Sequence, residues 1–429
     1  MSPHAIAETE SGRPLRVAVA ARSVYPLHRY GGLERHVYDL VRSLLDRGAY
    51  VTLITPPPNA DRPSDAQADA MFGHLRLTMR PVTYHTFPFA NRRGTTILDR
   101  STAYPLFGWR AGRVAAELSA AGAIDIVHGL GASVLGYALG STEDRRVPLV
   151  LNPQGLEEFG ATDPGRVRLK RIGYFPLRVA VRRCARSADR VLATDRALVT
   201  PVLNHLNVAA EKVRVVPNAI ELSECDRPDS ATRAEALRRH AGLRPEDTVL
   251  LSVGRLEANK GFDVLVRALG ALSADGALGD QWRWVLIGDG PMRPALEREI
   301  IAHGLAGHAL LRGRAEAADL HGWYEAATLF VHPTLYEGSS LVTLEAMAHR
   351  RAVVATRAGG LPDKVFDGVN GWLVAPGDAF AFASAVREAL SDRARLRRMG
   401  DESRALVERE FSWSAATDRL LDVYRELVP

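Results

Sequence analysis

Short apolar runs, each followed by a polar loop and then by apolar residues at helical spacing, occur along most of the 429-residue chain. The first run, at 15–21, leads through a glycine-containing loop into a helix-like segment, and a second run follows at 50–55. Strand, loop, helix and strand form the βαβ unit of a parallel sheet, whose strands are apolar throughout because helices cover both faces. The sequence therefore predicts an α/β fold.

The strand-like runs fall into two series, separated by the polar and charged segment 221–248. The runs lie at 15–21, 50–55, 124–130, 147–154, 189–194 and 213–217, and then at 248–256, 282–290, 309–313, 329–333 and 352–356. Domains usually contain about 100–200 residues, so this length suits two of them. We predict two doubly wound Rossmann-like domains, 1–220 and 221–410, with ligand at the carboxyl ends of the strands and in a cleft that the domains face.

Composition and charge exclude several classes of protein. Hydrophobic residues make up 46% and charged residues 24% of the chain, as in globular rather than disordered proteins. A net charge of +5 is too small for a nucleic-acid-binding field. Cys184 and Cys225 form neither a disulfide framework nor a metal-ligand spacing, Glu8 and Glu10 occupy the place of a signal peptide's apolar run, and no 18-residue apolar stretch occurs. We expect a cytoplasmic protein with no partner nucleic acid.

The segment 164–188 is strongly basic. It contains eight basic and no acidic residues, interleaved with apolar ones. Such a stretch can lie on an anionic membrane surface, which would make the protein peripheral on the inner membrane face. It can equally be a solvated helix whose apolar side chains turn into the core, and the sequence leaves both interpretations open.

Only four of the basic residues are lysines, and one of them, Lys260, lies with Arg255 at the exit of the apolar run 248–256. Two cations at a strand exit suit a diphosphate, arginine as a bidentate fork and lysine as a point charge. A solvated loop is the alternative. The rarity of lysine favours the functional interpretation.

Glycines follow the first strand-like run as well. Gly31 and Gly32 open a predicted helix, where free N–H groups favour a phosphate. An ordinary tight turn is the alternative. Gly288 and Gly290 of the GDGP sequence at 288–291 are typical of a turn and lack the full dinucleotide fingerprint.

The stretch 337–345 combines a polar loop with the start of a helix. The loop from Glu337 to Ser340 exposes amides at a helix N-terminus, and Glu345 is expected about two turns inside that helix. Glu345 could accept hydrogen bonds from the vicinal hydroxyls of a ribose, and Glu337 could face a sugar or a developing positive charge. Alternatively, Glu337 is only a favourable charge at a helix start.

His128 ends the run 124–130 and is expected to point at the predicted cleft. A histidine at a strand end is either a structural residue or a group that takes part in chemistry. The final segment, 411–428, has apolar residues on one side of a helix and could pack on either domain.

Taken together, these motifs resemble the glycosyltransferases of family four, which have the GT-B fold. The resemblance rests on GGLERH at 31–36, DIVHG at 125–129, VVPNAI at 215–220, SVGRLEANKGFDVL at 252–265, LIGDGP at 286–291 and the long stretch 337–374. It spans nearly the whole chain and is densest in the second half.

The resemblance implies a retaining, metal-independent transferase that moves a sugar from a UDP- or GDP-sugar to a glycan, lipid-linked or small-molecule acceptor. Arg255 and Lys260 would clamp the leaving diphosphate, Glu345 would hold the ribose, Glu337 would lie by the donor sugar, and His128 would lie near the reacting centre. The implied donor-binding set is Gly31, Gly32, Arg255, Lys260, Gly288, Gly290, Arg314, Glu337, Gly338, Ser339, Ser340, Leu341, Val342 and Glu345. The final helix, 411–429, would cross back to complete the N-terminal domain.

The sequence departs from the family pattern in three places. Ser339 and Ser340 replace a frequent Phe-Gly pair, Leu130 replaces a second histidine, and Ala219 replaces a glycine. A nucleotide-sugar epimerase on the same fold stays open as an alternative, because two α/β domains around a diphosphate serve both reactions. The missing second histidine and the basic segment 164–188 also leave open a non-catalytic nucleotide-sugar-binding scaffold.

Overall fold

The structure is a computed structural model that divides into two compact units. It describes residues 6–9, 11–28, 31–60, 65–85, 96–140, 146–154, 156–159 and 172–428, except the side chains of 67, 96–100 and 157. The first unit takes the chain up to Asn218 together with the segment from Trp413 onward, and the second contains Ala219–Ser412.

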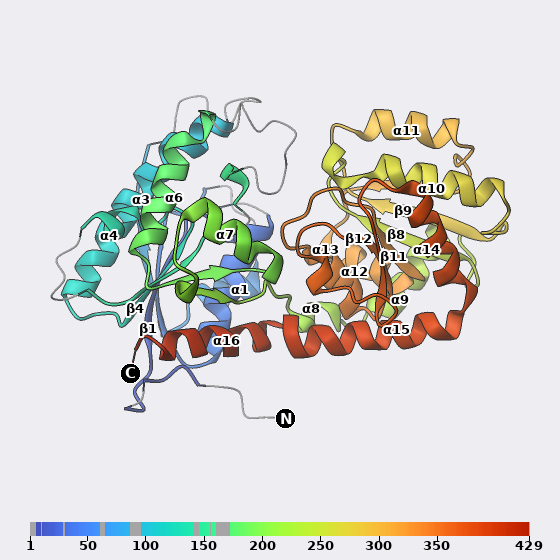
Figure 1. The fold of residues 1–429 in the computed structure, drawn as a ribbon. Helices are drawn as coiled ribbons and strands as arrows, with labels where there is room; N and C mark the ends of the chain where they lie inside the picture. The colour runs from blue at the N-terminus through green and yellow to red at the C-terminus, as the bar shows by residue number, and fades with distance from the viewer. Residues whose placement is uncertain are drawn as a thin grey trace. The chain divides into compact units, whose positions relative to one another are not determined.

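The first unit is built on a parallel sheet whose described strands run in the order β3-β2-β1-β4-β5-β6-β7 (Figure 1). The strands are β1 (Arg16–Ala20), β2 (Tyr50–Thr55), β3 (Leu77–Pro81), β4 (Ile126–Leu130), β5 (Leu149–Asn152), β6 (Arg190–Ala193) and β7 (Val213–Val215). The helices are α1 (Gly32–Asp46), α2 (Ala66–Phe72), α3 (Thr96–Ala120), α4 (Leu135–Leu139), α6 (Phe175–Ser187), α7 (Val199–Leu206) and α16 (Trp413–Arg425).

The second unit contains a parallel sheet of the same kind, in the order β10-β9-β8-β11-β12-β13. Its strands are β8 (Thr248–Val253), β9 (Trp282–Ile287), β10 (Ala309–Gly313), β11 (Leu329–His332), β12 (Val353–Thr356) and β13 (Gly371–Val374). Its helices are α8 (Leu222–Cys225), α9 (Ser230–His240), α10 (Phe262–Ala274), α11 (Arg293–Ala302), α12 (Ala317–Ala326), α13 (Leu341–Ala348), α14 (Ala379–Ser391) and α15 (Arg393–Leu406).

Both faces of the second sheet are buried. Along β8, Val249 and Leu251 belong to one hydrophobic cluster, together with Tyr324 of α12, whereas Leu250 belongs to another, together with Leu265 of α10. Alternate side chains of one strand thus supply two cores, which explains the uninterrupted apolar run in the sequence. The predicted α/β class with two Rossmann-like sheets is confirmed.

Two edge strands were missing from the prediction, for physical reasons. In β3 the side chains are exposed or half-buried, because the strand has a neighbour on one side only. In β13 the run is short and begins with Gly371, where an added Cβ would lie 2.1 Å from the carbonyl oxygen of Val353. Neither strand therefore contains the long apolar run that marks a central strand.

The final helix packs within the first unit, as the resemblance implied. Thr417 of α16 hydrogen-bonds Ser43 of α1, and Arg47 pairs with Asp418 and donates to the Ser414 hydroxyl at 3.0 Å. This contact joins the last helix to the first one of the chain (Figure 1).

Candidate active site

The candidate site lies where β8 and β11 end side by side in the second unit. The strand order reverses between these two strands, since β9 follows β8 on one side and β12 follows β11 on the other. Ligands of doubly wound sheets bind at this switch point, outside the carboxyl ends of the strands. The loops that leave the two strands, 254–261 and 333–340, carry six of the residues expected from the sequence: Arg255, Lys260, Glu337, Gly338, Ser339 and Ser340.

Lys260 and Glu337 meet across the switch point. Lys260 ends a short 3-10 turn after β8, and its ammonium lies 2.8 Å from Oε2 of Glu337. The same oxygen is 3.1 Å from Nε2 of His332, the last residue of β11. The structure thus brings together two predicted residues and adds a histidine to them.

The charges of this cluster follow from its surroundings. Burial acts to raise the pKa of Glu337, but the hydrogen bond from His332 and the positive charge of Lys260 outweigh it and lower that pKa to about 2. Burial also lowers the pKa of His332, although Glu337 opposes the shift. At neutral pH the carboxylate is therefore charged and the imidazole neutral, with its Nε2–H donated to Glu337 and its buried Nδ1 unpartnered among the described residues.

A glycine contact fixes the backbone of Glu337. Gly359 has a φ of +51°, and a Cβ there would lie 1.7 Å from the carbonyl oxygen of Glu337. The next residue, Gly360, donates its N–H to the carbonyl of Gly338 at 3.0 Å. Only glycine permits both the left-handed conformation and this close approach.

The loop continues into the N-terminus of α13. Ser340 is the N-cap, and its hydroxyl accepts from the N–H of Thr343 at 3.4 Å. Leu341 and Val342 form the first helical residues, whose N–H groups have no acceptor inside a helix. Next to them, the hydroxyl of Ser339 is buried and has no hydrogen-bond partner within the described part of the chain. This end of the helix can bind an anion.

Glu345 lies closer to this helix end than the sequence suggested. The helix begins at Leu341, so Glu345 is little more than one turn inside it, and the expected two turns were wrong because 337–340 is not helical. The Tyr324 hydroxyl of α12 donates to Oε2 of Glu345 at 2.7 Å. The carboxylate is thus oriented by a buried tyrosine.

The predicted arginines of the site face solvent. The side chain of Arg255 is 75% exposed and pairs with Glu257 at 2.8 Å. Arg314, which follows β10, is also exposed. An exposed ion pair contributes little to stability, so Arg255 is available to a ligand at small cost.

Gly288 and Gly290 have a packing role. A Cβ on Gly288 would lie 1.9 Å from the carbonyl oxygen of Gly254, and one on Gly290 would lie 2.5 Å from that of Leu256. The two glycines therefore let the GDGP loop pack directly on the loop that carries Arg255 and Lys260.

In the first unit, Gly31 and Gly32 lie at the exposed start of α1. Gly31 is the N-cap, and Tyr30 before it lies outside the described residues. The nearest atom to a Cβ on Gly31 would be a carboxylate oxygen of Glu34, the end of a flexible side chain. Backbone packing does not explain this glycine, unlike those of the GDGP loop.

The expected position of His128 was wrong. The residue lies in the middle of β4, fully buried, and its Nδ1 is 2.7 Å from the hydroxyl of Tyr424 in α16. Burial, and secondarily the charge of His36, lower its pKa to about 3, so it is neutral. The last residue of the strand is Leu130, which is apolar.

Sequence reasoning missed His332 and Tyr324. Both lie within apolar stretches, where a histidine or tyrosine is typical of the core. One feature of the sequence could have indicated a role for His332: it ends a strand-like run, five residues before Glu337.

Two protein families match the chain. The family described as "Glycosyltransferase Family 4" matches residues 30–224, and "Glycosyl transferases group 1" matches residues 247–392, so the two ranges span most of the chain.

Curated relatives and solved structures are similar over long stretches. A D-inositol 3-phosphate glycosyltransferase of Xylanimonas cellulosilytica is 28% identical over 96% of both chains, and an alpha-D-kanosaminyltransferase of Streptomyces kanamyceticus is 33% identical over 58% of this chain and 63% of its own. Sucrose-phosphate synthase from Thermosynechococcus elongatus superposes with a TM-score of 0.71 at 21% identity, over 96% of this chain and 99% of its own. Anabaena HepE in complex with UDP superposes with a TM-score of 0.69 at 21% identity, over 96% of this chain and all of its own. The chain belongs to glycosyltransferase family 4 and is a retaining GT-B enzyme that uses a nucleotide-sugar donor.

Proposed function

We propose that the diphosphate of the donor binds at the ends of β8 and β11, between Lys260, Arg255 and the N-terminus of α13. The observation that carries this proposal is the Lys260–Glu337–His332 cluster at the switch point of the sheet. Ser339 and the N–H groups of Leu341 and Val342 face the same ligand, with Arg314 as a further donor contact. Glu345, held by Tyr324, accepts hydrogen bonds from the ribose.

The ion pair offers both charges that the reaction needs. When the anomeric bond breaks, negative charge grows on the diphosphate and positive charge grows on the sugar. Lys260 stabilises the first and Glu337 the second, and fixed groups in a partly buried site act more strongly than solvent would. Because the two groups are 2.8 Å apart, they suit charges that develop on neighbouring parts of one ligand.

We infer that the donor is a UDP-sugar and the acceptor a small polyhydroxylated molecule. The first inference is supported by the similarity to HepE, which was solved with UDP, and the second by the relative named for D-inositol 3-phosphate. GDP-sugars and glycan or lipid-linked acceptors are the other candidates, and the experiment below separates them.

The test is a transfer assay with the full-length protein. UDP- and GDP-sugars are each offered with an inositol phosphate, a soluble glycan and a lipid-linked glycan, and the anomeric configuration of the product is read by NMR. We expect transfer from a UDP-sugar with retention and without added Mg²⁺ or Mn²⁺, because Lys260 and Arg255 neutralise the diphosphate. Conversion of the donor to another nucleotide sugar without any acceptor would indicate an epimerase. Nucleotide binding without any turnover would indicate a scaffold.

We further propose that α6 lies against an anionic membrane surface, with the enzyme on the inner face of the membrane. The basic residues at 166–171 lie outside the described residues. Of the apolar residues in the segment, Leu177 and Val181 pack in the core, whereas Ile172, Phe175 and Val179 are 79%, 61% and 50% exposed.

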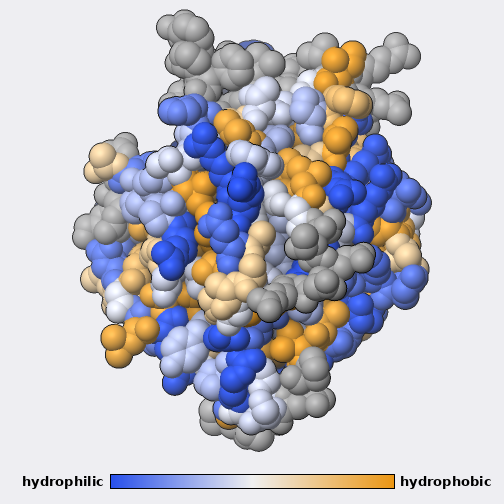
Figure 2. Space-filling view, turned by 90° about the vertical axis from the view of Figure 1, so that its left-hand side faces the viewer, coloured by the Kyte–Doolittle hydropathy of each residue, from blue (hydrophilic) through white to orange (hydrophobic). Residues whose placement is uncertain are grey.

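The neighbourhood of α6 supports this orientation. Arg183 and Arg186 are exposed one and two turns after Val179. The side of the molecule that carries α3, α4 and α6 shows hydrophobic patches between hydrophilic ones (Figure 2). No helix within the described ranges has the length and apolar character to span a bilayer. We expect salt-sensitive binding to anionic but not to neutral liposomes, and equal binding to both, or none, would contradict this proposal.

A further inference from the structure

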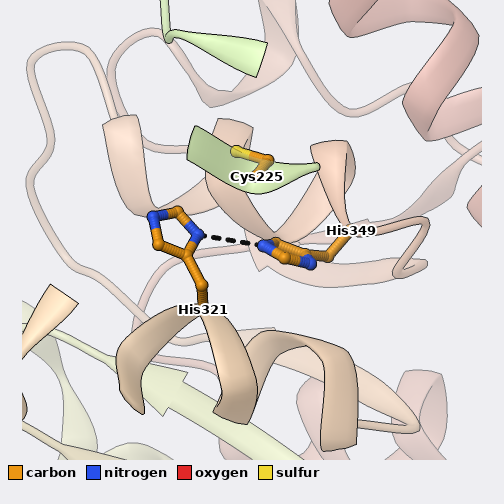
Figure 3. Close-up of side chains that lie close together, drawn as sticks. All are labelled: Cys225, His321 and His349. Atoms are coloured by element: carbon orange, nitrogen blue, oxygen red, sulfur yellow. Dashed lines mark hydrogen bonds between the residues drawn. The ribbon is translucent and has the colours of Figure 1, made fainter. Parts of the chain in front are cut away.

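Three metal-ligating side chains from separate segments meet inside the second unit. Cys225 ends α8, His321 lies on α12, and His349 follows α13. One ligand atom from each lies within 4.8 Å of the other two, and all three residues are buried. Figure 3 shows the two imidazoles directed at each other, with Cys225 beside them.

The distances are close to those of a metal site. Zinc binds imidazole nitrogen at about 2.0–2.1 Å and thiolate sulfur at about 2.3 Å, which places tetrahedral ligand atoms about 3.3–3.8 Å apart. Nδ1 of His321 lies 3.0 Å from Nε2 of His349. The two nitrogens are thus slightly closer than in a tetrahedral site, and the sulfur lies within 4.8 Å of both. Small movements of the three side chains would give the separations of a zinc site.

A carboxylate already orients one of the imidazoles. Nδ1 of His349 lies 3.3 Å from Oε2 of Glu325, and the other oxygen of Glu325 pairs with Arg351 at 3.3 Å. With Nδ1–H donated to Glu325, the lone pair on Nε2 of His349 points toward His321. The pairing of a carboxylate with the outer nitrogen of a ligand histidine is typical of metal sites.

We propose that Cys225 Sγ, His321 Nδ1 and His349 Nε2 bind a divalent transition-metal ion of the zinc type. One thiolate and two imidazoles suit zinc, and water completes the coordination. On binding, the thiol releases its proton to solvent, and the Nδ1 proton of His321 moves to its Nε2. Spacing in the sequence could not reveal this set, because the three ligands come from 225, 321 and 349.

The site lies directly behind the proposed ribose contact. The ring of Tyr324 stacks on His349, with centroids 5.6 Å apart, and its hydroxyl donates to Glu345. A bound metal would therefore act as a positioning group for Glu345, a consequence that rests on the proposed function, whereas metal binding itself does not.

The experiment is cobalt titration and metal analysis of the full-length, untagged protein. We expect about one zinc ion per chain after purification, and a cobalt–thiolate charge-transfer band when zinc is replaced by cobalt. Cys225→Ala should lose the band and the stoichiometric zinc, and His349→Gln should bind cobalt at least tenfold more weakly. Cys184→Ala is the matched control, because it removes the other buried cysteine and should leave the band intact.

Two readouts keep the test decisive. If Cys225→Ala fails to fold, the spectra of the wild type and of Cys184→Ala still decide. In Cys184→Ala, Cys225 is the only thiol, so a cobalt–thiolate band can come from no other residue. A wild-type protein without a cobalt–thiolate band, or Cys225→Ala with unchanged metal content, would overturn the proposal. Neither readout depends on glycosyl transfer, so failure of the proposed function is distinguishable from failure of the metal site.

Discussion

The two sheets share one topology but have different chemistry at their switch points. In the second unit, the exits of β8 and β11 bring a lysine, a carboxylate and a histidine within hydrogen-bond distance. In the first unit, the corresponding strands are β1 and β4, where β4 ends in Leu130 and its histidine is buried against Tyr424. Gly31 and Gly32 leave the start of α1 exposed, and the first turn of this helix carries Glu34.

This difference shows that the position of a ligand site and its chemistry have separate causes. The parallel sheet determines where a ligand can bind, at the same edge in both units. Charged and hydrogen-bonded side chains determine what binds there, and the second switch point carries the Lys260–Glu337 ion pair. This ion pair is the reason why we propose that the diphosphate binds to the second unit. The predictions that follow test this contrast.

Replacement of Lys260 should have the largest effect. Lys260→Ala removes the half-buried cation of the site and leaves Glu337 without its charge partner. Loss of a fixed charge-stabilising group typically lowers kcat by about 10²–10³-fold, and we expect a similar loss in kcat/KM for transfer. The control is Lys212→Ala in the first unit, whose ammonium donates to the carbonyl of Ala188 at 2.9 Å. Equal rates of transfer for the two variants would contradict the proposed role of Lys260 in the site.

Replacement of Gly359 should have the next largest effect. In Gly359→Ala, the new Cβ must displace the carbonyl of Glu337, and we expect about tenfold slower transfer and a loss of stability above the 1–2 kcal/mol that a left-handed alanine costs. Gly368→Ala is the matched control, because Gly368 has a φ of +78° with no atom within 4 Å of an added Cβ. Urea unfolding and initial rates measure both variants. Equal losses would show that the contact with Glu337 is unimportant.

The pH dependence of stability should reveal the ion pair. The folded pKa of Glu337, about 2, lies below its ordinary value of 4.5. Its contribution to the free energy of unfolding is therefore complete above pH 4.5 and is lost as the pH falls from 4.5 toward 2. In Glu337→Gln this part of the pH dependence should disappear. An unchanged profile in urea unfolding over that interval would contradict the predicted charge state.

Removal of the hydroxyl from Tyr424 should have the smallest effect. Tyr424→Phe deletes the hydrogen bond to His128 and should cost about 1 kcal/mol of stability. We expect kcat within about twofold of the wild type, because His128 is a buried structural residue in our account. A loss of transfer comparable to that of Lys260→Ala would indicate that His128 takes part in the reaction, and would weaken the contrast between the units.

The sequence predicted the fold well because central strands are continuous apolar runs. The edge strands β3 and β13 were missed, since half-exposed or short strands contain no such run. Lys260 and Glu337 were also predicted, from rare lysine usage and from a polar loop before a helix. Their direct pairing could not be predicted, because 77 residues separate them and only the sheet order brings their loops together.

The sequence predicts least well those residues whose type fits both a structural and a functional role. His128 and His332 both lie in apolar strands, and only the three-dimensional register shows that the first contacts a tyrosine and the second a carboxylate. From the sequence, Gly288 and Gly290 are expected in a turn or in contact with the donor. Their close approach to the neighbouring backbone is visible only in the structure.

The most direct test of the central claim is the equilibrium binding of UDP, measured by isothermal titration calorimetry without acceptor. The donor site in the second unit predicts that wild type and Lys212→Ala bind UDP equally, and that Lys260→Ala binds it at least tenfold more weakly. Equal affinity of all three proteins would contradict the assignment of the diphosphate to the ends of β8 and β11.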